Sequence, residues 1–123
     1  MKVIDDILLY KLALTKLPDL KDVIVTGNFY CDRNNLTSLE GASKFVGDHF
    51  YCDRNNLTSL EGAPKYVGGN FNCSNNNLTS LEGAPKFVGG DFICANNKVE
   101  FTEEYVRSLV RVGGEVYVHL LDV

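Results

Sequence analysis

Basic residues are in short supply in this sequence. Its 123 residues include 12 lysines and arginines against 16 aspartates and glutamates, which gives a formal net charge of −4. Nucleic acids and anionic membranes are usually bound through a basic patch. We therefore expect neither of them as the main partner, and a basic or neutral protein fits the charge better.

Long hydrophobic runs are missing as well. No apolar segment has the roughly 20 residues needed to span a bilayer. The apolar N-terminus, MKVIDDILLYKLAL, is interrupted by Asp5, Asp6 and Lys11, and no small-residue cleavage site follows it as in a secretory signal. These features favour a soluble, cytoplasmic protein, and the apolar content is sufficient for a single domain with one core.

Histidine is scarce, since the chain holds only His49 and His119. On strands separated by three intervals, the two imidazoles would lie about 14 Å apart and could not share a metal ion. His49 and Asp53 fall two outward positions apart on one expected strand, but no nucleophile with a base and an orienting group accompanies them. We predict no catalytic residue, no metal site and no cofactor.

The sequence does contain a repeat with a period of 21 residues. The stretch FYCDRNNLTSLEGA occurs at residues 29–42 and again, unchanged, at residues 50–63, while NNLTSLEGA returns at residues 76–84. A fixed period of this length indicates a solenoid, in which each unit forms one coil that stacks on the next.

Within each unit, residues are expected to alternate between the interior and the surface. Alternate residues of a strand face the same side, so Phe29 and Cys31 should point inward and Tyr30 outward. The asparagine after each strand, Asn34 in this unit, should form hydrogen bonds with otherwise unpaired backbone groups of the turn and of a neighbouring coil. The aliphatic series predicted to fill the interior are Leu36, Leu57, Leu78 and Val99, then Leu39, Leu60 and Leu81, then Val46, Val67 and Val88.

Four cysteines recur at the period of the repeat: Cys31, Cys52, Cys73 and Cys94. Parallel, in-register side chains do not suit the roughly 90° torsion of a disulfide. Zinc sites usually draw pairs of cysteines from tight knuckles instead of a linear column. We predict buried free thiols.

The segment that returns to the next strand, Glu-Gly-Ala-Pro-Lys, is too short and too rich in glycine and proline for a regular helix. We expect turns or an extended segment there. The glycine pairs at residues 68–69 and 89–90 should mark a bend with little room for a Cβ atom.

Both ends depart from the repeat and are predicted to be caps. Residues 1–13 should form an N-terminal helix, because Ile4, Ile7 and Leu8 have helical spacing. Residues 14–101 hold the repeats. Residues 102–123 should form a helix from Thr102 to about residue 112 and then a final strand, since VGGEVYV repeats the pattern of VGGDFIC after 24 residues. We expect about five parallel strands on right-handed coils.

The segment Phe-x-Cys-x-x-Asn-x-Leu fits the leucine-rich-repeat pattern L-x-L-x-x-N-x-L, with Phe and Cys in place of two aliphatic residues. Over residues 14–118 the chain resembles bacterial effector leucine-rich repeats and, more closely, small repeat proteins of tailed phages rich in Asn-Asn-Leu-Thr-Ser-Leu-Glu-Gly-Ala-Pro. The resemblance implies a leucine-rich-repeat solenoid that binds proteins. It also implies a phage-encoded factor that inhibits or sequesters a host defence protein.

The outward positions of the strands are the candidate binding surface, because they vary while the inward positions are uniform. Tyrosine and arginine with few lysines are typical of interface hot spots. Copying of the repeat alone would also produce such a face. The residues that we expect to contact a partner are Tyr30, Tyr51, Asn72, Ile93, Tyr117, Asp32, Asp53, Arg33, Arg54 and His49. Beside them, the outward rows include Asn28, Asn70, Asp91, Glu115, Ser74, Ala95 and His119, whereas the repeated Glu40, Glu61, Glu82 and Lys44, Lys65, Lys86 rows are interpreted as solvated scaffold.

Two functional hypotheses follow. The first is a non-catalytic, cytoplasmic module that binds a protein partner on this surface. The alternative is a self-associating assembly protein, for example a homodimer, that uses the terminal strand at residues 115–123 or the N-terminal helix, because an apolar last strand without a cap is an exposed edge.

Overall fold

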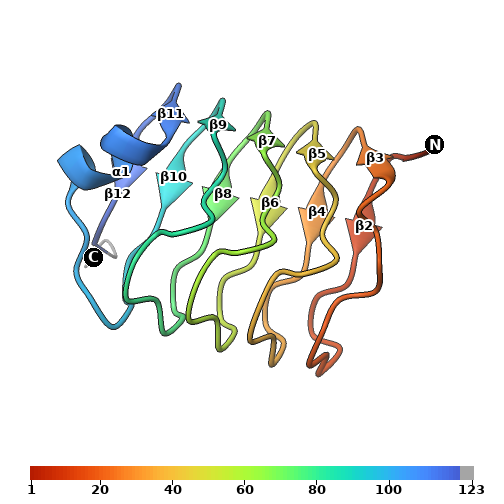
Figure 1. Cartoon of the computed structure of the whole chain (residues 1–123), viewed down its shortest axis with the longest axis horizontal. Coiled ribbons are helices and arrows are strands. Elements are labelled where there is room, and N and C mark those ends of the chain that lie inside the picture. The colour runs from red at the N-terminus through yellow and green to blue at the C-terminus, as the bar shows by residue number, and fades with distance from the viewer. Residues whose placement is uncertain (120–123) are drawn as a thin grey trace.

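The computed structural model describes residues 1–119 and shows a β-solenoid whose coils lie side by side along one axis (Figure 1). Two parallel sheets of six strands run along it. The first sheet contains, in spatial order, β1 (Lys2–Ile4), β3 (Val23–Val25), β5 (Phe45–Val46), β7 (Tyr66–Val67), β9 (Phe87–Val88) and β11 (Arg111–Val112). The second sheet contains β2 (Ile7–Leu8), β4 (Phe29–Tyr30), β6 (Phe50–Tyr51), β8 (Phe71–Asn72), β10 (Phe92–Ile93) and β12 (Val116–Tyr117).

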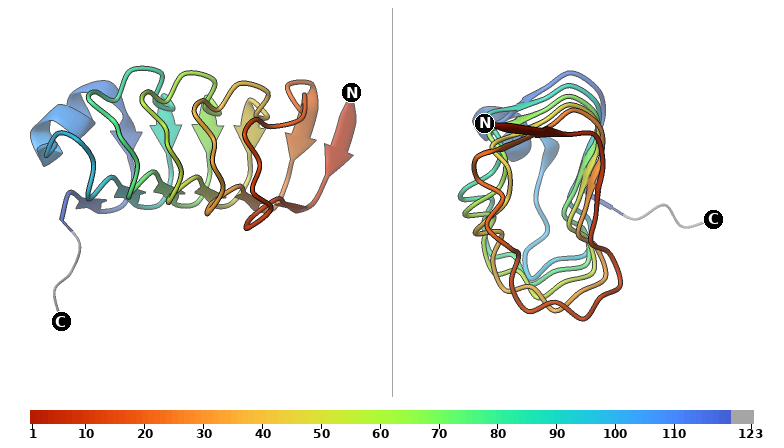
Figure 2. Two further views of the ribbon diagram at one scale, coloured as in Figure 1. Left: turned by 90° about the horizontal axis from the view of Figure 1, so that it is seen from below. Right: turned by 90° about the vertical axis from the view of Figure 1, so that its right-hand side faces the viewer.

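The repeat with its 21-residue coils is confirmed, but the expectation of one sheet with about five strands is wrong. Each coil makes a strand in both sheets, and the two sheets occupy adjoining sides of the coil in the end-on view of Figure 2. The expected final strand exists as β12, and its pairing of Phe92 with Val116 confirms the longer last interval. Residues 120–123 of the predicted terminal strand lie outside the described residues.

The interior contains one column for each inward position of the repeat. Phe29, Phe50, Phe71 and Phe92 are fully buried, and consecutive rings lie 5.0, 5.6 and 5.2 Å apart between centroids. The predicted leucine and valine columns are buried beside them. Val99 is the exception, since 43% of its surface is exposed, because the chain leaves the coil after Asn97 to enter the helix. The core is thus a set of stacked apolar columns.

The cysteine column is buried and unpaired, as predicted. Burial raises the pKa of the Cys31, Cys52 and Cys73 thiols well above the ordinary value and raises that of Cys94 to about 12. The thiols are therefore protonated at neutral pH and act as small apolar groups.

The asparagine ladder is also confirmed. Asn55 donates from Nδ2 to the carbonyl oxygens of Cys31 and Cys52 at 3.0 and 3.1 Å, and its Oδ1 accepts from the backbone N–H of Leu36 at 3.0 Å. Asn34 and Asn76 make the same kinds of contact one coil away. One amide per coil thereby satisfies the backbone where the second sheet ends.

The corner between the two sheets depends on glycine. A Cβ atom on Gly68 would meet the carbonyl oxygen of Gly47 in the preceding coil, and one on Gly89 would meet that of Gly68. Neighbouring coils are too close here for any side chain, as the glycine pairs predicted. The return path turns at Gly41, Gly62 and Gly83, whose φ angles are +99°, +94° and +87°.

The predicted N-terminal helix is wrong, because this segment forms β1 and β2 instead. The backbone N–H of Thr26 donates to Ile4 O at 2.9 Å, and that of Leu9 donates to Tyr30 O at 2.8 Å, which fixes the first coil on its neighbour. Pairing with an adjacent coil outweighs the local helical spacing of the apolar residues. Leu17, in the segment Leu-Thr-Lys-Leu-Pro that resembles Leu-Thr-Ser-Leu-Glu of the repeat, is buried in the core.

The C-terminal helix α1 (Glu103–Leu109) begins as predicted, with the Thr102 side chain accepting from the N–H of Tyr105 at 3.1 Å. It ends before residue 112, because β11 begins at Arg111 and pairs with β9. Val106 and Val110 are buried, so the helix closes the last part of the core.

Candidate functional site

The outer face of the second sheet holds a small aromatic group. Tyr30 on β4 and Tyr51 on β6 are register neighbours, and their rings stack with centroids 4.8 Å apart. The His49 ring stacks on Tyr51 at 5.7 Å. Partial burial raises the pKa of the Tyr30 phenol, and Tyr51 and Asp48 add to the rise. The stacked group offers a half-buried, rigid surface with phenol O–H groups that can donate.

An acidic pair lies beside the tyrosines. Asp32 and Asp53 follow them at the same position of adjacent coils, and only 16% and 15% of their side-chain surfaces are exposed. Burial, and then the charge of Asp32, raises the pKa of Asp53. Within residues 1–119, neither carboxylate accepts a hydrogen bond from a side chain, while a backbone hydrogen bond and the charges of Arg54 and Arg33 partly offset the rise in the pKa of Asp53. A cationic group from a partner would relieve this repulsion.

Arg33 and Arg54 come next along the chain, and both have a left-handed backbone with a φ of +58°. Asn75 and Asn96 occupy the equivalent positions at +57° and +59°, and asparagine tolerates this conformation better than arginine. The arginine Nε atoms lie 3.9 and 4.0 Å from the neighbouring aspartate oxygens, too far for a good hydrogen bond. The arginines thus occupy positions where the fold favours asparagine.

The side chains two residues before the tyrosine column have a structural role that was not predicted from the sequence. Each of them accepts a hydrogen bond from the backbone N–H of the next coil: Asp6 from Asn28, Asn28 from His49, His49 from Asn70, Asn70 from Asp91, and Asp91 from Glu115, at 2.8 to 3.0 Å. His49 accepts with Nδ1, so its proton lies on Nε2 near Asp48. The sequence signal for this role is that Asp, Asn and His each have a side-chain atom that can accept a hydrogen bond.

The remaining predicted residues form one column but no single cluster. Asn72, Ile93 and Tyr117 continue the tyrosine column by register. Asn72 Oδ1 accepts from the N–H of Ser74, and 37% of Tyr117 is exposed. Ser74 and Ala95, expected on the surface, are buried because their small side chains lie close to the sheet. His119 lies 3.0 Å from Glu100 and apart from the site.

Sequence reasoning also missed an aromatic column on the outer face of the first sheet. Phe45, Tyr66 and Phe87 are register neighbours on β5, β7 and β9, with ring centroids 4.8 and 5.0 Å apart. The available signal was the repeated Lys-Phe/Tyr-Val-Gly, in which an aromatic residue precedes each valine predicted to be buried.

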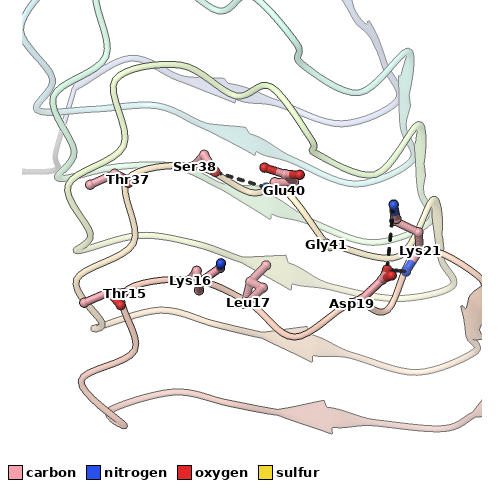
Figure 3. Close-up of a pocket in the computed structure, with 9 residues that line it drawn as sticks. All are labelled: Thr15, Lys16, Leu17, Asp19, Lys21, Thr37, Ser38, Glu40 and Gly41. Atoms are coloured by element: carbon pink, nitrogen blue, oxygen red, sulfur yellow. Dashed lines mark hydrogen bonds and ion pairs between the residues drawn. The ribbon is translucent and has the colours of Figure 1, made fainter.

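A hollow lies on the return side of the first two coils, between Thr15–Leu17 and Thr37–Gly41 (Figure 3). Its charges are mixed, and Asp19 pairs with Lys21 at 4.0 Å, while Ser38 accepts from the N–H of Glu40. The polar groups do not converge on a point in the hollow. Across residues 1–119, no cluster of three or more His, Cys, Asp or Glu side chains is arranged to hold a metal ion.

No protein-family model, curated protein or solved structure matches the chain. Within the described part of the chain, no helix is both long and apolar enough to cross a membrane.

Proposed function

We propose that this protein is a non-catalytic binding module that docks a protein partner on the outer face of its second sheet. The observation that carries the proposal is the stacked Tyr30–Tyr51 pair, set directly beside the Asp32 and Asp53 carboxylates. Half-buried tyrosines beside charged groups are typical of interface hot spots. The strained arginine positions add support, because the fold alone favours asparagine there.

The charge and aromatic character of this face favour one chemical class of partner surface. Two adjacent carboxylates, of which Asp53 has a raised pKa, favour a partner with an exposed lysine or arginine, and the tyrosines favour an apolar rim around that cation. In its more specific form, the partner is a host protein that a phage-encoded chain sequesters or inhibits. That version rests only on the resemblance of the repeat to small phage proteins.

The test is affinity purification from cells of the natural source or host, with mass spectrometry of the bound proteins. Tyr30→Ala/Tyr51→Ala should lose the partner that the unaltered chain retains. Tyr66→Ala is the matched control, because it removes a stacked and more exposed tyrosine from the first sheet. Recovery of the same partner with the double variant would show that this face is not the docking surface.

A further inference from the structure

The outer face of the first sheet has its own interaction chemistry. Phe45, Tyr66 and Phe87 form the aromatic column, and 40% of Phe45 and 39% of Tyr66 remain exposed. Val3 and Ile24 extend the column toward the N-terminus in the same register. A contiguous exposed apolar stripe of this kind marks an interaction surface.

The stripe is bordered by a basic column. Lys44, Lys65 and Lys86 each precede a ring of the aromatic column and are exposed. None of them makes an ion pair within residues 1–119. The border of the stripe is therefore basic on a chain whose net charge is −4, although Glu82 lies near Lys65 and Lys86. Charge complementarity calls for an acidic occupant.

Ring orientation narrows the chemistry of that occupant. Phe45 and Tyr66 are inclined by 3° and Tyr66 and Phe87 by 15°, so the rings cover one another's faces along the column. Bases of single-stranded nucleic acids stack on exposed ring faces. Here the faces are occupied, and the rings instead suit apolar side-chain contacts. We therefore favour a protein surface over a nucleic acid.

The second sheet of the same chain is a surface of the required kind. It has an aromatic pair, Tyr30 and Tyr51, with the 4.8 Å spacing found between Phe45 and Tyr66. It also has a column of carboxylates, Asp32 and Asp53, at the same interval because both sheets are built from the same coils, with Arg33 and Arg54 next to them along the chain. An isolated helix or extended strand would not repeat at this spacing, whereas stacked parallel strands do.

The order of the columns along the chain makes the two faces match. When two solenoids contact each other with parallel axes, their strands run in opposite directions across the contact. The lysines come before the rings on the first sheet, and Asp32 and Asp53 come after the tyrosines on the second. With the aromatic columns opposed, the lysine column therefore lies opposite the aspartate column.

We propose that the outer face of the first sheet docks on the outer face of the second sheet of another copy, with the solenoid axes parallel. Each copy has one face of each kind, so the contact is heterologous and assembly continues past a dimer. It covers Tyr30 and Tyr51, so a self-associated copy hides the surface assigned above to a partner. The inference does not require the proposed function, because the lysine face takes no part in that function.

The test uses light scattering of the full chain over a range of concentrations, with a pair of charge-reversal variants. One variant is Lys44→Glu/Lys65→Glu/Lys86→Glu, and the other is Asp32→Lys/Asp53→Lys. We expect the average mass of the unaltered chain to rise past that of a dimer and to fall with added salt. Each variant alone should lose this association by roughly tenfold or more, because like charges then meet.

An equimolar mixture of the two variants should regain the association. The lysine face of the Asp→Lys variant then meets the intact aspartates of the Lys→Glu variant. The inference is overturned by a strict monomer at all concentrations, by a mass that stops at a dimer, by assembly that survives the Lys→Glu changes, or by a mixture that stays monomeric. If thermal unfolding shows that Asp32→Lys/Asp53→Lys does not fold, Asp32→Asn/Asp53→Asn replaces it and should weaken the association.

Discussion

At the scale of the residue, the ladder amide of Asn55 has the largest structural role. It serves buried backbone groups of two coils through Nδ2 and Oδ1. Asn55→Ala leaves these groups without partners, and we expect the free energy of unfolding to fall by about 3 kcal/mol. Asn56→Ala, at the exposed neighbouring position, should change it by less than about 0.5 kcal/mol. Urea denaturation of both variants measures the difference, and equal values would refute the role of the ladder.

Asp53 is a residue at which stability and binding should oppose each other. Its raised pKa means that the folded chain holds this proton more readily than the unfolded chain, so the carboxylate destabilises the fold at neutral pH. Asp53→Asn should raise the free energy of unfolding by about 0.5 kcal/mol at pH 7. The gain should disappear as the pH falls through the raised pKa, because Asp53 is then protonated in the unaltered chain.

Denaturation of Asp53→Asn at several pH values checks this prediction, with Asp22→Asn as the exposed control. The same variant should bind the partner more weakly, since the proposed site needs the carboxylate. A variant that is less stable at pH 7, or that keeps its gain at low pH, would contradict the account.

At the scale of the element, the corner between the sheets sets the distance between coils. Gly68→Ala would place a methyl group against the carbonyl oxygen of Gly47. Because neighbouring coils are held by in-register hydrogen bonds, we expect a loss of about 2 kcal/mol in the free energy of unfolding. Asp48→Ala at the same corner should cost less than about 0.5 kcal/mol, because Asp48 is exposed. Thermal unfolding compares them, and equal effects would remove the steric argument.

The elements that the sequence predicted are those that repeat. The period specifies the coil length, and the spacing of Phe, Cys, Leu and Asn specifies which residues are buried. The first sheet was missed because Phe45–Val46 and its copies lie between the return segment and a glycine, a composition that indicates turns. The N-terminal strands were missed because Ile4, Ile7 and Leu8 have helical spacing, and only pairing with the next coil decides between the two structures.

The candidate site was predicted in part for the same reason. Alternation placed Tyr30, Tyr51, Asp32 and Asp53 on the outside, and the structure brings them together. It did not show that the His49 row bonds the next coil, because that depends on the closeness of neighbouring backbones. Nor did it show that Ser74 would be buried.

At the scale of the whole molecule, one stack of coils carries a lysine column beside its first sheet and an aspartate column on its second. The acidic face of the second sheet carries the proposed partner site, and the proposed contact between copies joins the basic face of one copy to the acidic face of the next. Because the two faces lie on adjoining sides of the coil, the lysine column can be altered without changing the partner site (Figure 2). The main functional proposal is that a protein partner docks on the acidic face of the second sheet.

That claim is tested most directly by titrating the purified partner with the dilute, monomeric chain. Removal of two hot-spot tyrosines should cost about 2 kcal/mol or more, so Tyr30→Ala/Tyr51→Ala should raise Kd by at least about 30-fold. Tyr66→Ala should leave Kd within about threefold, a change of under 1 kcal/mol. An unchanged Kd for the double variant, or an equal rise for Tyr66→Ala, would contradict docking on the second sheet.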